Sequence, residues 1–69
     1  MTLKELGEQY LREAAALRVR IDQLRPLLKS LDDSEALTLQ NRISALYAEA
    51  LDARRTGEYL IHYYEDGGQ

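Results

Sequence analysis

The sequence predicts an all-α protein, an antiparallel helical hairpin of two long helices that dimerises into a four-helix bundle. Three observations support this prediction. Apolar and small residues recur at alternating spacings of three and four along two long stretches, which is the pattern of helices packed side by side. Asp32, Asp33 and Ser34 interrupt the pattern between the stretches, and so short a connection returns the second helix along the first. Further apolar residues lie beside these two repeating series, and a second copy of the chain would be needed to bury them.

The first helix is predicted over about residues 3–31. Thr2 and Glu5 have the spacing of a capping box, in which each side chain accepts a hydrogen bond from a free amide at the helix start. Pro26 falls at an outward position and lacks an amide proton, so we expect a kink near Asp22–Pro26. A full break is not expected, because the apolar series continues in phase beyond the proline. The series comprises Leu3, Gly7, Tyr10, Ala14, Leu17, Ile21, Leu24, Leu28 and Leu31.

A turn at about residues 32–34 leads to a second helix over about residues 35–65, followed by a frayed tail at residues 66–69. Asp32 and Ser34 are both good N-cap residues, so two starting points for this helix remain open. Gly67 and Gly68 are typical of a helix C-terminus. The second series comprises Ala36, Leu39, Ile43, Leu46, Ala50, Ala53, Gly57, Leu60 and Tyr64.

Glycines occur in both series, at Gly7 and Gly57. Folding the chain at its bend pairs residues whose numbers add up to roughly 65, which places each glycine near bulky residues of the other helix. We therefore expect Tyr10 and Tyr64 to fill the space that the two glycines leave. The alternative is that the helices merely tolerate the glycines, at about 1 kcal/mol each relative to alanine.

Composition excludes several classes of function. The chain has 69 residues, which is one domain at most, and it contains no cysteine, so disulfides and thiolate metal sites cannot form. The net charge of −3 argues against a general polyanion binder. The first ten residues lack the apolar run of a signal peptide, and no stretch is typical of a membrane helix. We expect a cytoplasmic protein that does not enter a membrane.

Catalytic, cofactor and metal sites are not predicted. With no cysteine and a single histidine, His62, the chain lacks a nucleophile paired with a base, and it has no glycine-rich phosphate loop. Glu58, His62 and Glu65 share one helix face and could in principle hold a metal. One histidine with two carboxylates is a poor zinc site, however, so an ordinary exposed histidine is the better interpretation. We predict a protein that is not an enzyme and needs no cofactor.

One flank of the hairpin carries a second apolar stripe, strongest on the second helix. We predict that this flank is an oligomer or partner face, and that two copies meet there as a four-helix bundle. The alternative is that these residues only widen the interface within one hairpin, and an exchange of helices between two chains is also compatible with the pattern. The predicted face comprises Leu11, Leu37, Tyr47, Leu51 and Ile61.

Two further surfaces contain arginine. Arg18, Arg25 and Arg54 form an edge that could receive an acidic helix or a nucleic-acid backbone.

The second surface, Arg55, Tyr59 and Tyr63, is an aromatic patch suited to single-stranded nucleic acid or to protein. Nearby carboxylates repel phosphate and favour protein. The sequence thus predicts a small, non-enzymatic interaction or scaffolding module that self-associates and binds a protein partner. The alternative is a nucleic-acid-associated regulator that uses the arginine edge.

Overall fold

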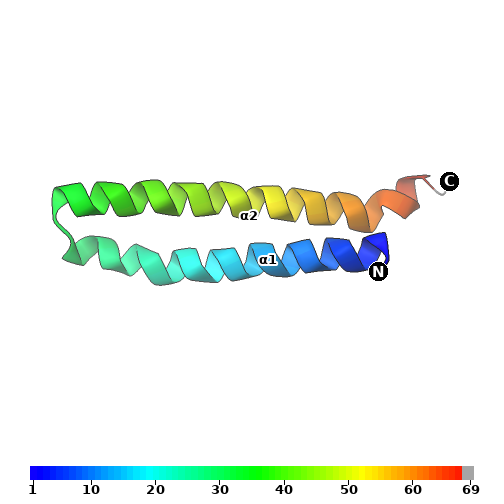
Figure 1. Cartoon of the computed structure of the whole chain (residues 1–69), viewed down its shortest axis with the longest axis horizontal. Coiled ribbons are helices and arrows are strands. Elements are labelled where there is room, and N and C mark those ends of the chain that lie inside the picture. The colour runs from blue at the N-terminus through cyan, green and yellow to red at the C-terminus, as the bar shows by residue number, and fades with distance from the viewer. Residues whose placement is uncertain (68–69) are drawn as a thin grey trace.

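The structure, a computed structural model, describes the backbone of residues 1–67 and the side chains of residues 1–63. Helix α1 spans Leu3–Leu24, a 3-10 helix η1 spans Arg25–Ser30, and helix α2 spans Asp33–Gly67. Figure 1 shows α1 and α2 side by side in opposite directions, with the start of α1 beside the end of α2. The prediction of an all-helical hairpin is confirmed. We call the end near residues 31–32 the bend and the other end the open end.

The capping box at the start of α1 is confirmed. The backbone amide of Glu5 donates to the Thr2 hydroxyl oxygen at 3.1 Å, and the amide of Thr2 donates to the Glu5 carboxylate at 3.3 Å. Each bond satisfies an amide that has no partner within the first helical turn. The helix therefore begins where the local sequence predicts.

The structure corrects the single α-helix predicted over residues 3–31. The α-helix ends at Leu24, and the chain continues as the 3-10 helix η1, which has Pro26 in its first turn. The amide of Arg25 still donates to the carbonyl of Ile21, whereas Pro26 has no amide to continue the α-helical pattern. A proline in the first turn costs a 3-10 helix no hydrogen bond, so the chain tightens at the predicted kink without breaking. Leu28 and Leu31 consequently stay half-buried, in phase with α1.

Asp32 is the N-cap of α2, which resolves the two starting points left open by the sequence. Its carboxylate accepts the amide of Glu35 at 2.8 Å, and its carbonyl accepts the amide of Ala36 at 2.8 Å. Helix α2 therefore begins at Asp33 and not at residue 35, and it continues to Gly67 and not to residue 65. Gly68 and the end of the predicted tail lie outside the described residues.

Replacing Asp32 with alanine should lower the free energy of unfolding by about 1 kcal/mol, the usual effect of losing an N-cap. Urea denaturation followed by circular dichroism measures this change. Asp33→Ala is the control, since Asp33 lies in the first turn of α2 but does not make the capping bond, and its loss should cost about 0.3 kcal/mol through the helix dipole. A larger effect at Ser34→Ala than at Asp32→Ala would show that the cap is assigned to the wrong residue.

The core lies along the line where α1 and α2 meet. Every position of the two predicted series within residues 1–63 is buried or half-buried. The buried apolar side chains of that part of the chain are Ala14, Ala50 and Ile21, and Ile21 is only 3% exposed. The heptad pattern is therefore confirmed as the helix–helix contact, and small side chains make up most of its centre.

Gly7 and Gly57 face each other, which corrects the expected pairing of glycine with bulk. A Cβ atom built on either glycine would lie 2.7 Å from the carbonyl oxygen of the other. The side chains nearest to these positions are Ile61 beside Gly7 and Leu11 beside Gly57, and not Tyr10. The side chain of Tyr64 lies outside the described residues. The two helices thus touch backbone to backbone here, and only glycine permits so close an approach.

The hairpin is a rod that measures 55 × 14 × 14 Å. Its radius of gyration is 16.0 Å, whereas a compact chain of this length would have about 11 Å. Its accessible surface is 5425 Å², compared with about 4,400 Å² for a compact protein of this mass. A single hairpin therefore leaves much more surface in contact with water than a globular domain does.

Candidate interaction surface

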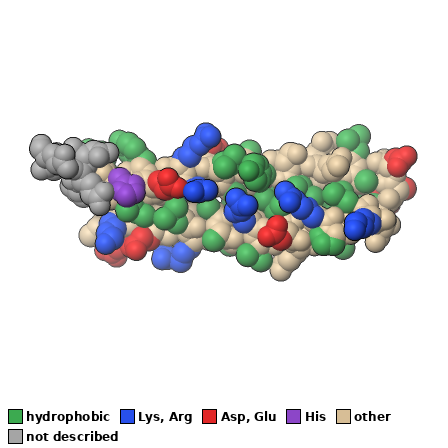
Figure 2. Space-filling view, turned by 180° about the vertical axis from the view of Figure 1, so that it is seen from behind, with side chains coloured by type: hydrophobic (Ala, Val, Ile, Leu, Met, Phe, Trp, Pro, Cys, Tyr) green, Lys and Arg blue, Asp and Glu red, His purple; other side chains and the backbone are tan. Residues whose placement is uncertain are grey.

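An apolar groove of about 230 Å³ crosses the middle of the rod between α1 and α2. We call it the central groove. Figure 2 shows one long side of the rod, on which hydrophobic side chains alternate with a row of Lys and Arg. The groove is lined by Leu11, Ala14, Ala15, Arg18, Tyr47, Ala50, Leu51 and Arg54.

The groove exists because small residues lie at the contact between the two helices, while larger side chains flank that contact on both helices. Ala14 and Ala50 are buried at the contact and form the floor. Leu11 rises from α1, while Tyr47 and Leu51 rise from α2. An alanine cannot fill the space between such neighbours, so a hollow remains that water or another apolar group must occupy.

The structure brings together three of the five residues predicted for an oligomer or partner face. Leu11, Tyr47 and Leu51 all line the central groove, and Tyr47 is 41% exposed. Ile61 is half-buried beside Gly7, and it thus serves the hairpin's own interface, as Leu11 does in part. Leu37 is exposed in the first turns of α2 and does not line this groove.

The predicted arginine edge is divided between two hollows. Arg18 and Arg54 line the central groove, whereas Arg25 lines a hollow of about 450 Å³ nearer the bend. Arg54 donates from Nε to a carboxylate oxygen of Glu58 at 2.8 Å. Both side chains are more than half exposed, so this pair contributes little to stability. It does, however, neutralise one of the three predicted cations.

Tyr59 and Tyr63 form an edge-to-face ring contact, with centroids 5.8 Å apart and planes at 68°. We call them the tyrosine pair. They are 64% and 46% exposed. The third residue of the predicted patch, Arg55, lines a shallow hollow with Leu51, Arg54 and Glu58.

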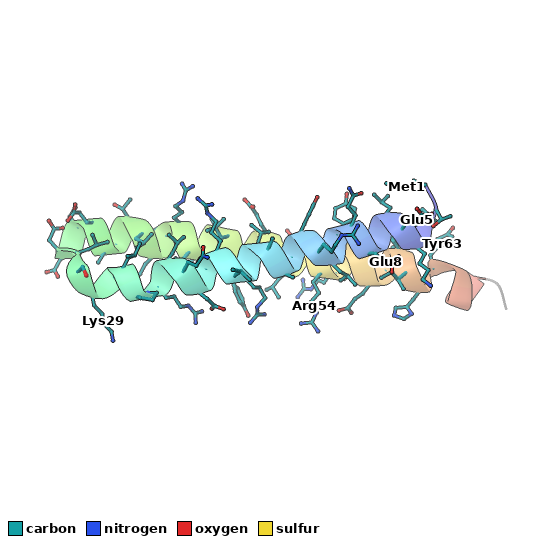
Figure 3. The ribbon with its side chains drawn as sticks, turned by 90° about the horizontal axis from the view of Figure 1, so that it is seen from below. Met1, Glu5, Glu8, Lys29, Arg54 and Tyr63 are labelled. Atoms are coloured by element: carbon teal, nitrogen blue, oxygen red, sulfur yellow. The ribbon has the colours of Figure 1, made fainter. Side chains whose placement is uncertain are left out.

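The tyrosine pair faces away from the central groove. Tyr63 follows Arg54 by nine residues, which at about 100° per residue places it on the opposite face of α2. Figure 3 shows Lys29 and Arg54 projecting from one long side of the rod, and Met1 and Glu5 on the other, with Tyr63 near them at the open end. The molecule therefore has two separate candidate surfaces.

Two features escaped the sequence analysis. The floor of the central groove was not predicted, although Ala14 and Ala50 both stand in the heptad series. These two alanines lie opposite each other when the two helices are paired antiparallel, and that pairing could have predicted a hollow between them. A second hollow of about 570 Å³ lies along α1 and includes Leu17 and Val19. Its wall mixes apolar side chains with charged residues from both helices.

No protein-family model, curated protein or solved structure matches this chain. Function must therefore be inferred from the surfaces themselves. Within residues 1–63 no three His, Cys, Asp or Glu side chains are grouped to bind a metal, and the side chain of Glu65 lies outside that range. Over the described helices, no segment has the length and apolar character needed to cross a membrane.

Proposed function

We propose that this chain is a small helical interaction module that self-associates through the central groove and offers the tyrosine pair to a protein partner. The observation that supports the proposal is the groove itself, an apolar hollow beside a tyrosine that is 41% exposed. Leu11, Tyr47 and Leu51 gain further burial only if a second molecule covers them. Two hairpins that meet on this side form a four-helix bundle.

The exposed area is sufficient for such a dimer. Each hairpin exposes 5425 Å², whereas a compact protein of twice the mass exposes about 7,300 Å². A bundle of two copies as compact as a globular protein would therefore bury about 3,500 Å² in total, which is the upper bound for two elongated rods. Homodimer interfaces that hold marginal subunits together range over about 2,000–5,000 Å².

A second protein would contact the opposite side of the rod, where the tyrosine pair stays exposed in the proposed dimer. Tyrosine suits this role, because it offers a broad amphipathic surface and loses little side-chain entropy on binding. The alternative function, a nucleic-acid-associated regulator, has less support. Arg54 is paired with Glu58, and Arg25 lies in a different hollow from Arg18.

Replacing Tyr47 with glutamate should weaken self-association at least tenfold, or by about 1.4 kcal/mol, because a carboxylate would be buried without a partner. Sedimentation velocity over a range of concentrations measures the dimer dissociation constant. Glutamate is a better helix former than tyrosine, so the hairpin itself should keep its helical circular dichroism spectrum.

Tyr59→Glu is the matched control, since it makes the same change on the opposite side of the rod. Its dissociation constant should equal that of the unmodified chain. An unmodified chain that sediments as a monomer at tens of micromolar would refute self-association. Equal weakening by the two substitutions would place the interface elsewhere.

A further inference from the structure

We infer that the two hairpins of the proposed dimer lie in the same direction, bend beside bend, so that α1 of each copy packs on α2 of the other. This inference rests on the proposed self-association through the central groove, and it names the helix that each groove receives. A two-fold axis then runs lengthwise between the two hairpins. In the opposite arrangement one copy is turned end for end, and each helix packs on its own counterpart.

The groove side of α1 and η1 carries a positive strip of side chains. On helices packed in heptads, residues seven apart share a face, so the positions in line with Leu11 and Ala15 lie on the groove side. Lys29 lies beyond α1 in η1, and it projects on the same side as Arg54 (Figure 3). The charged members of this first strip are four cations and two carboxylates, namely Lys4, Arg18, Arg25, Lys29, Glu8 and Asp22. The first strip is therefore positive by two charges.

The groove side of α2 carries a strip of the opposite sign. Among residues 1–63, the positions in line with Tyr47 and Leu51 include three charged side chains, namely Asp33, Arg54 and Glu58. This second strip is negative by one charge. Asp32 lies at the bend, where its carboxylate caps α2, and counting it with the first strip would still leave that strip positive.

The direction of the second copy decides which strips meet. Two copies of the same direction bring the positive first strip of each against the negative second strip of the other, and opposite charges favour association. A reversed pair brings first strip against first strip and second strip against second strip. It sets Arg25 against Lys4 of the partner copy and Asp22 against Glu8 of the partner copy, and such like-charged contacts oppose association. The charges of both helices therefore favour the same direction.

The register of the hairpin carries over to the contact between copies, because an axis along the rods leaves every residue at its own level. Within the hairpin, Arg25 shares a hollow with Gln40, so these two residues lie at about one level. Lys29 lies four residues beyond Arg25 in the 3-10 helix, or about 8 Å along the rod. Asp33 precedes Gln40 by seven residues of α-helix, or about 10 Å in the same direction. The Lys29 cation of one copy thus comes close to the Asp33 carboxylate of the partner copy.

Four charges meet near the open end of the same-direction dimer. Because Gly7 lies level with Gly57, Lys4 comes within one helical turn of Glu58 of the partner copy. Glu8 likewise comes within one turn of Arg54 of the partner copy. Glu8 also lies close in level to Glu58 of the partner copy, but a cation flanks each of these carboxylates, and Arg54 already bonds Glu58 within its own chain. The cluster has two charges of each sign, so it is neutral.

Side-chain size gives an independent reason for the same direction. The groove is lined by the small Ala15 on α1 and by the larger Leu51 on α2. In the same direction each Leu51 lies on Ala15 of the partner copy, so a large side chain meets a small one in both contacts. In the reversed pair Ala15 meets Ala15 and leaves a hollow, while Leu51 meets Leu51. The same-direction dimer also brings Arg18 level with the ring of Tyr47 of the partner copy, which permits a cation–π contact.

The chain contains no cysteine, so disulfide formation tests the direction. We suggest mixing reduced Ala15→Cys and Leu51→Cys chains in equal amounts, letting disulfides form in a glutathione buffer, and measuring the masses of the covalent dimers. In the same-direction dimer Ala15 faces Leu51 of the other chain, whereas the two Ala15 positions lie diagonally across the bundle. Mixed covalent dimers should exceed dimers of one variant with itself by roughly tenfold, because disulfides need Cα atoms within about 7 Å.

Arg25→Cys and Gln40→Cys repeat the test at two exposed positions, where the substitutions leave the apolar groove intact. Mixed dimers should again predominate. In a reversed pair the Arg25 position of one copy and the Gln40 position of the other lie toward opposite ends of the rod, so no disulfide could join them.

A predominance of dimers of one variant with itself would overturn the inference and leave self-association intact. An absence of covalent dimers from both pairs of variants, in chains that still sediment as dimers, would also overturn it, since the groove could not then be the interface. Monomeric sedimentation of the unmodified chain would instead remove the proposed function.

Discussion

Replacing Gly57 with leucine should lower the free energy of unfolding by about 3 kcal/mol or more, the upper range for overpacking a helix contact. The first atom of the new side chain already falls 2.7 Å from the carbonyl oxygen of Gly7. That oxygen belongs to the backbone of α1, so it cannot rotate away as a side chain would. The helices would have to separate, which would expose Leu11 and Ile61 where they now cover the glycines.

Gly57→Ala tests the same contact with the smallest possible change. Helix propensity alone would make this substitution stabilising by about 1 kcal/mol. The close approach opposes it by about 1–3 kcal/mol, so we expect the free energy of unfolding to fall by up to about 2 kcal/mol in total. Urea denaturation at one protein concentration measures both variants.

Ala48→Leu is the control for Gly57→Leu, because it adds a large side chain on the exposed face of α2. It should change stability by no more than about 0.5 kcal/mol. If Gly57→Leu left the denaturation midpoint unchanged, the backbone contact between the glycines could not exist as described.

Replacing Ile21 with alanine should cost about 2–5 kcal/mol, because this side chain is 3% exposed at the centre of the helix contact. A domain of this size has a total stability of only about 3–10 kcal/mol. The midpoint of thermal unfolding should therefore fall by roughly 10 °C or more, as followed by circular dichroism.

Val19→Ala is the matched control for Ile21→Ala, two residues earlier on the same helix. Val19 is also β-branched but is 56% exposed, so its loss should shift stability by about 0.5 kcal/mol at most. Both variants must be compared at one concentration, because the proposed dimer would add to the apparent stability. Equal shifts at the two positions would contradict the described core.

The heptad series and the capping box of α1 were predictable, because they depend on residues close together in the chain. A stripe such as Leu17, Ile21 and Leu24 must be covered, and in a short chain only the other helix can cover it. Every described position of both series is accordingly buried or half-buried. Thr2 caps α1 as its spacing with Glu5 predicts.

The conformation of the chain around Pro26 was only partly predictable. The missing amide is visible in the sequence, but a bend and a tighter helix are both possible responses to it. The choice depends on keeping Leu28 and Leu31 against α2, which is a contact between segments distant in the chain. The 3-10 helix satisfies this requirement.

The register between the helices was not predictable, although the predicted pairing came within a residue or so of it. A shift of one residue decides whether Gly7 meets a bulky side chain or meets Gly57, and only the second arrangement lets the backbones touch. The same register places Ala14 and Ala50 at the floor of one groove, and it places Gln40 and Ile43 beside Arg25 in another hollow. Periodicity and capping follow from the order of residues along one helix. Register and hollows arise only when two helices pack, because they depend on how the shapes of both surfaces fit together.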